Sequence, residues 1–179
     1  SNNDTAVFGK AVSLQLTGKL DEAAAVYQSA LAKNPSSEDA LVNLISIGIS
    51  RKDTNTIREY AERLLTLRPY SQAAVEGLAT VAFSSGDFEA AAKFCAKLVE
   101  FTPDSFERWF NLGVAYQRTG RLDQSAKAYA EAVKYRTDSK NAYVNLGVVL
   151  HEVGDHKGAR EAYERALKLA PDVPAVIYN

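Results

Sequence analysis

The sequence is poor in the residues that usually carry disulfide, metal-binding or catalytic chemistry. Its 179 residues include one cysteine, two histidines and no methionine. The single cysteine, Cys95, cannot form a disulfide within the chain, so the cysteine count favours neither an oxidising nor a reducing compartment. Because methionine is missing even at position 1, we expect Ser1 and Asn2 to be the remnant of a cleaved tag on a fragment of a longer protein.

Net charge and long apolar runs are also lacking. The 21 basic and 22 acidic residues nearly balance, so no overall field would draw the chain to nucleic acid or to an anionic membrane. No apolar run approaches the roughly 18 to 20 residues of a membrane span, and the N-terminus lacks the basic start and apolar core of a signal peptide. We therefore expect no nucleic-acid partner and no membrane span, and the compartment stays open.

No grouping of residues points to catalysis. His151, Glu152 and His156 faintly resemble the zinc-binding pattern HExxH, but the histidines are five residues apart instead of four, and Gly154 ends the helix between them. We interpret them as two surface histidines beside a turn. The chain has neither a glycine-rich phosphate loop nor a recognisable nucleophile with its base, so we expect no cofactor, no metal and no enzymatic activity in this segment.

What the sequence does contain is a repeat. From Tyr143 to Pro171, large apolar residues recur at helical spacing on both sides of Gly154, which predicts two short amphipathic helices joined by a turn. Prolines mark a period of 34 residues, because Pro35, Pro69 and Pro103 are evenly spaced and Pro171 follows two periods later. Each proline is expected to end a helix, and the polar residues after it are expected to begin the next.

Eight positions of this stretch match the signature of the tetratricopeptide repeat, or TPR, namely Tyr143, Leu146, Gly147, Leu150, Ala159, Tyr163, Ala166 and Pro171. The chain therefore resembles a TPR protein. The resemblance implies one all-α domain over residues 1–179, a right-handed α-solenoid of stacked antiparallel helix pairs. Its repeats would cover residues 4–37, 38–71, 72–105, 106–139 and 140–173, with the start of a sixth helix pair or a truncated cap at 174–179.

Repeat two departs from the others. Where the two helices of a repeat touch, the other repeats mostly carry small residues, but repeat two carries Ile45, Ile57 and Leu64. Its turn has Lys52 where most repeats have glycine. Because bulky residues hold helix axes apart, we expect helices 38–50 and 55–67 to be spaced more widely than the helices of repeat five.

Cys95 falls at the register position occupied by tyrosine in three other repeats, a core position on the second helix. We expect it to be an inert, buried thiol.

The TPR resemblance also implies where a ligand would bind. In the family, the first helices line a concave groove, and residues one, two and five places beyond the Trp109 or Tyr143 position point inward. Asparagine occupies the second of these places at Asn43, Asn111, Asn145 and Asn179, and the row is interrupted by Gly9 and Gly77. Because an asparagine amide both donates and accepts, such a row could pair with a peptide backbone. The alternative is that the asparagines pack adjacent repeats together.

The other inward places carry apolar residues that could hold peptide side chains, although they could equally be half-buried between helices. Polar residues at the groove edge could add contacts. The predicted peptide-binding set is Asn43, Phe110, Asn111, Val114, Gln117, Asn141, Val144, Asn145, Val148 and His151. A free carboxylate terminus is not the expected ligand, because the positions where related clamps carry lysine and arginine lack cations here.

The resemblance thus implies a protein-interaction module that binds a peptide or partner segment in its groove. Two alternatives stay open. The chain could be a structural scaffold that self-associates through its ends, where Ile177 and Tyr178 lie, or through its convex face. It could also be the substrate-selecting arm of an enzyme whose catalytic domain lies beyond this fragment.

Overall fold

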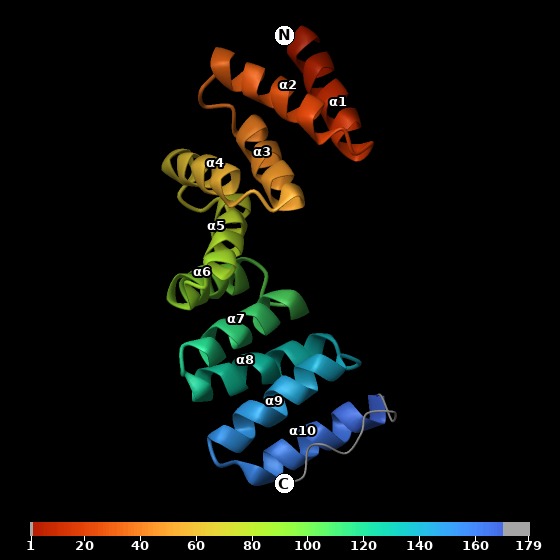
Figure 1. Ribbon diagram of the computed structural model, residues 1–179, viewed down its shortest axis with the longest axis vertical. Coiled ribbons are helices and arrows are strands. Elements are labelled where there is room, and N and C mark those ends of the chain that lie inside the picture. Colours follow the sequence, from red (N-terminus) through yellow and green to blue (C-terminus); the bar gives the residue numbers. More distant parts are fainter. Residues whose placement is uncertain (1, 170–179) are drawn as a thin grey trace. The chain divides into compact units, whose positions relative to one another are not determined.

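The computed structural model describes residues 2–169 as an all-helical chain (Figure 1). Over this range it has ten helices and no strand: α1 Asn2–Leu16, α2 Leu20–Lys33, α3 Glu38–Arg51, α4 Thr54–Leu67, α5 Gln72–Ser85, α6 Phe88–Phe101, α7 Phe106–Arg118, α8 Leu122–Tyr135, α9 Lys140–Glu152 and α10 His156–Leu169. Each predicted repeat contributes one pair of helices. Within the described range, none of the helices has the length and apolar character that crossing a membrane requires.

The chain divides after Asp87 into two compact units. The first holds α1 to α5 and the second α6 to α10, so the division falls inside predicted repeat three. A single domain over residues 1–179 stays a prediction. The end of predicted repeat five and the start of a sixth at 174–179, with Pro171, Ile177 and Tyr178, lie outside the described residues.

The turns within the helix pairs follow the sequence pattern. Four of them use a glycine with positive φ, at Gly18, Gly86, Gly120 and Gly154, which relieves the steric cost of the left-handed conformation. Lys52 takes the same conformation in repeat two, with φ 58° and ψ 30°. Helix α4 then begins at a strong cap, since the Asp53 carboxylate accepts hydrogen bonds from the backbone amides of Asn55 and Thr56.

In repeats four and five, a tyrosine ring of the second helix packs against a glycine of the first. A Cβ added at Gly113 would lie 2.7 Å from Cδ1 of Tyr129, and one at Gly147 would lie 2.5 Å from Cε1 of Tyr163. The α7–α8 pair is also joined by the buried Ser125, whose hydroxyl donates to the Gly113 carbonyl at 2.7 Å. The small residues therefore let each ring pack directly against helix backbone.

In repeat two the large and small residues change places. Ile45 stands at the glycine position of the first helix, and Ala61 stands at the tyrosine position of the second. Gly48 of the first helix faces Ile57 of the second. A Cβ at Gly48 would lie 2.9 Å from Cγ1 of Ile57 and 3.2 Å from its backbone nitrogen, so α3 and α4 stay close at this end of the pair. The wider axis spacing expected for repeat two stays a prediction, and Gly48 and Ala61 are the residues that offset the bulk of the isoleucines.

Candidate functional site

In the second unit, the predicted site residues lie on the first helices of repeats four and five. Phe110, Val114 and Gln117 follow the i, i+4, i+7 spacing of one face of α7, and all three are half-buried. On α9, Val144 and Val148 share a face and are half-buried as well. The other predicted residues of this unit differ in exposure: Asn111, Asn141 and His151 are exposed, and Asn145 is half-buried.

Tyr129 of α8 joins site residues of both first helices. Its side chain is fully buried, and its ring lies 5.6 Å, centroid to centroid, from the Phe110 ring. The Tyr129 hydroxyl donates to Oε1 of Gln117 at 3.0 Å and accepts from Nδ2 of Asn145 at 3.4 Å. A hydrogen-bonded chain therefore runs from Asn145 on α9, through Tyr129, to Gln117 on α7.

The two hydrogen bonds of Tyr129 fix which way the Gln117 and Asn145 amides point. The oxygen of the Gln117 amide is engaged by Tyr129, so its NH₂ group is directed away and can donate. The NH₂ group of Asn145 is engaged instead, which leaves its oxygen as an acceptor. Burial raises the pKa of Tyr129 to about 12, against a smaller lowering by the Asn145 hydrogen bond, so the phenol stays a neutral donor at physiological pH.

The first unit contains the same arrangement in repeat one. The Phe8 and Tyr27 rings are 5.6 Å apart, and the Tyr27 hydroxyl donates to Oε1 of Gln15 at 3.5 Å. Here the Gln15 amide donates onward, to the Ser46 hydroxyl on α3 at 3.2 Å. This arrangement of tyrosine and glutamine was not predicted from the sequence. Its signal is a glutamine 12 residues before a core tyrosine, which occurs in repeats one and four.

The asparagine row is divided by the structure. Asn43 belongs to the first unit, where its amide donates to the Asp39 carbonyl of its own helix at 2.8 Å. Gly77 interrupts the row because a Cβ there would lie 2.9 Å from Cγ2 of Ile45, leaving no room for an asparagine. Asn145 is tied to the preceding repeat, whereas the Asn111 side chain is exposed. Asn145 thus has the repeat-packing role that the sequence left as an alternative, and its oxygen remains for other contacts.

The apolar site residues of α7 also pack within the unit. Phe110 and Val114 lie against a buried cluster of α8, α9 and α10 residues that includes Tyr129 and Val149. The Phe110 ring stacks on Phe106 at 5.5 Å, and the guanidinium of Arg136 lies 4.0 Å from the Phe106 ring centroid. Phe110 is thereby held in place from two sides while it keeps part of its surface exposed.

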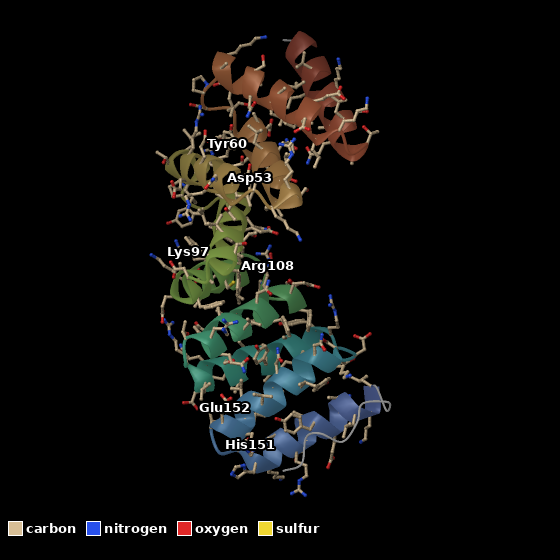
Figure 2. All side chains as sticks on the ribbon, in the orientation of Figure 1. Asp53, Tyr60, Lys97, Arg108, His151 and Glu152 are labelled. Atoms are coloured by element: carbon tan, nitrogen blue, oxygen red, sulfur yellow. The ribbon has the colours of Figure 1, made fainter. Side chains whose placement is uncertain are left out.

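The two histidines come together at the turn between α9 and α10. Their rings are 5.1 Å apart and both side chains are exposed, with His151 at the end of α9 next to Glu152 (Figure 2). They do not share a helix face, as expected, but the turn brings their rings into contact. Among the described residues there is no group of three or more His, Cys, Asp or Glu side chains that could hold a metal ion.

A comparison of the sequence with protein families gives the same result as the repeat pattern and the helix pairs. The tetratricopeptide repeat model matches residues 2–53, 58–106 and 110–174. The chain belongs to the tetratricopeptide repeat family. TPR solenoids expose extended surfaces on which other proteins bind, so this TPR protein is a protein-interaction module.

Solved structures confirm the predicted TPR α-solenoid. A MamA structure from Desulfovibrio magneticus RS-1 matches with a TM-score of 0.84 at 17% identity and covers 98% of this chain and 99% of its own. YrrB, described as a TPR protein with an unusual peptide-binding site, matches with a TM-score of 0.84 at 20% identity and covers 93% of this chain and 86% of its own. At such identities the likeness concerns the fold. No curated protein matches the sequence.

Proposed function

We propose that this TPR protein binds an extended peptide segment of a partner protein in the concave groove of its solenoid, on the surface formed by α7 and α9. Gln117, Asn111 and Asn145 would bond to the peptide backbone, and Phe110 would contact a peptide side chain. The observation that carries the proposal is the hydrogen-bonded chain through Tyr129, which orients one amide as a donor and the other as an acceptor.

Oriented amides suit a peptide backbone because each peptide unit offers one carbonyl acceptor and one N–H donor. The Gln117 NH₂ group would donate to a carbonyl, and the Asn145 oxygen would accept from an N–H. Since both side chains are already held by Tyr129, less rotamer entropy is lost when a ligand binds. Asn111 is exposed and supplies both functions without prior orientation.

The apolar residues beside these amides support side-chain recognition. Phe110 is held by Phe106 and Tyr129, so it offers contact area at low entropic cost. Val114, Val144 and Val148 are half-buried and would line the floor between the two helices. The peptide-binding site described for YrrB, which shares this fold, makes peptide capture a reasonable use of the scaffold.

A random-peptide display library, selected on the wild-type protein, tests the proposal without knowledge of the natural partner. Asn111→Ala combined with Asn145→Ala should weaken the selected peptides at least tenfold, because two backbone contacts worth about 1 kcal/mol each are removed. The affinity is measured by calorimetry, and circular dichroism checks that helicity is unchanged.

The matched control is Asn55→Ala, which removes an exposed asparagine on α4 in the other unit and should leave affinity unchanged. Equal affinity of the double variant and the wild type would reject the α7–α9 surface. If the protein binds only its own copies, and the double variant does so equally, the self-associating scaffold becomes the better account.

A further inference from the structure

The second unit also has a cavity at the contact of repeats three and four, away from the proposed peptide-binding residues. It is a cavity of about 450 Å³ between α6, α7 and α8, with Val99, Trp109 and Tyr116 among its apolar lining residues. None of the predicted peptide-binding residues lines it. At 100° per residue, Trp109 and Tyr116 lie roughly 100° around α7 from the face of Phe110 and Gln117.

The first unit shows how the corresponding place is filled. Between α2 and α4 the cavity is only about 240 Å³. Tyr60 of α4, which is labelled in Figure 2, is among its lining residues. Tyr60 is 7% exposed, and its hydroxyl accepts a hydrogen bond from the Gln28 amide at 3.4 Å. A phenol held by an amide therefore occupies this place in repeats one and two.

Two repeats later, both members of that pair are alanine. Ala128 stands 68 residues after Tyr60, and Ala96 stands 68 residues after Gln28, so each alanine occupies the same register position as the residue that it replaces. Both alanines line the larger cavity. The two alanines remove one phenol and one amide from this place, while a neighbouring lining position stays apolar, with Leu31 in the first unit and Val99 in the second.

We propose that this cavity is a second binding site, which receives the aromatic side chain of a tyrosine or phenylalanine from a partner protein segment, in the place that Tyr60 fills in the first unit. Val99, Trp109 and Tyr116 provide apolar and aromatic surface on which a ring is buried and can stack. The Gln124 amide, also in the lining, can hydrogen-bond to a phenol hydroxyl, as Gln28 does to Tyr60.

The charges at the cavity specify the partner further. Lys127 and Glu131 of α8 both contribute to the lining. Glu131 already forms an ion pair with Lys134 at 2.5 Å, whereas Lys127 is exposed. The partner segment therefore carries an aspartate or glutamate about one helical turn from its aromatic residue, where the carboxylate pairs with Lys127.

Trp109 makes the site directly measurable, because it is the single tryptophan of the chain. Its indole N–H donates to the Pro103 carbonyl at 2.7 Å and gives one resonance in a ¹H–¹⁵N spectrum. The first probe is p-cresol, the side chain of tyrosine. It should shift this resonance saturably in the wild type, with a Kd of about 1 mM for a ligand of this size.

Ala128→Tyr places a phenol where Tyr60 stands in the first unit and should weaken p-cresol binding at least tenfold. Ala96→Leu narrows the cavity from α6 and should do the same, which keeps the test decisive if the first variant folds poorly. The control, Ala25→Tyr, adds a phenol at an exposed position of α2 and should leave the wild-type response.

The second probe tests the charge. It is an alanine-rich helical peptide with one tyrosine and a glutamate one turn to either side, which should bind at least tenfold more tightly than the same peptide with lysines for glutamates. Lys127→Glu should reverse that preference. No saturable shift in the wild type, or equal shifts in Ala128→Tyr, would overturn the proposal. A shift that grows with protein concentration alone and disappears in Ala128→Tyr would also overturn it, because a second copy would then fill the cavity.

Discussion

At the scale of single residues, burial decides which titratable groups are chemically available. Cys95 is 1% exposed, and burial raises the pKa of its thiol to about 11, against a smaller lowering by the charge of Arg108. The expected buried thiol is therefore confirmed, and its thiolate is scarce near neutral pH. The same cause acts on the tyrosines at this register position, since burial raises the pKa of Tyr27 and Tyr163 as well as that of Tyr129.

Tyr129 should make the protein less stable at alkaline pH. Its folded-state pKa of about 12 lies above the value near 10 of an unfolded chain, so the unfolded state loses the phenol proton first. The stabilising contribution is complete below about pH 10 and is lost as the pH rises toward 12. Thermal unfolding measured from pH 8 to pH 11.5 should show a shallower alkaline decline for Tyr129→Phe than for the wild type. Parallel declines would contradict the assignment.

At the scale of helices, the two helices of a pair pack closely where a small residue of one helix faces a large side chain of the other. In repeats four and five the first helix supplies glycine and the second a tyrosine, whereas repeat two has Ile45 at the glycine position and Ala61 at the tyrosine position, and its close contact lies between Gly48 and Ile57. The turn of repeat two differs too, because Lys52 takes a left-handed conformation that costs a residue with a Cβ about 1 kcal/mol. Contact between the helices is thus kept by different residues in different repeats.

Gly147→Ala should destabilise the protein by about 1 to 3 kcal/mol. The new Cβ would lie 2.5 Å from Cε1 of Tyr163, so the ring or the helix α10 must move. The matched control is Gly9→Ala on α1, where an added Cβ has nothing within 4 Å and should stabilise the helix by about 0.5 to 1 kcal/mol. Urea unfolding measures both, and a Gly147→Ala variant as stable as the wild type would show that the close ring contact is not needed.

At the scale of the whole chain, the sequence predicts the features that recur from repeat to repeat, and it does not predict the features that occur in single repeats. The period of 34 residues predicts turns at Gly18, Gly86, Gly120 and Gly154, and the structure has a glycine with positive φ at each of these places. The role of Tyr129 could not be predicted from one repeat, since its partners Gln117 and Asn145 belong to two helices of different repeats. The cavity beside Trp109 depends on two alanines, Ala96 and Ala128, whose significance appears only against Tyr60 and Gln28.

The structure also distributes the predicted site residues unevenly. Phe110, Val114, Gln117 and Asn145 gather around Tyr129, whereas Asn43 bonds to its own helix in the other unit. Sequence spacing alone gives the same weight to every asparagine of the row. Hydrogen-bond partners distinguish them, because they depend on which side chain fills the neighbouring position of the next repeat.

The most direct test of the account is the affinity of a library-selected peptide for Tyr129→Phe, measured by calorimetry beside the wild type. This change removes the hydroxyl that orients the Gln117 and Asn145 amides and leaves every proposed contact residue in place. We expect binding to weaken about tenfold, or about 1.4 kcal/mol, while the helical content is unchanged. Unchanged affinity in a folded Tyr129→Phe protein would contradict the claim that these oriented amides read the peptide backbone.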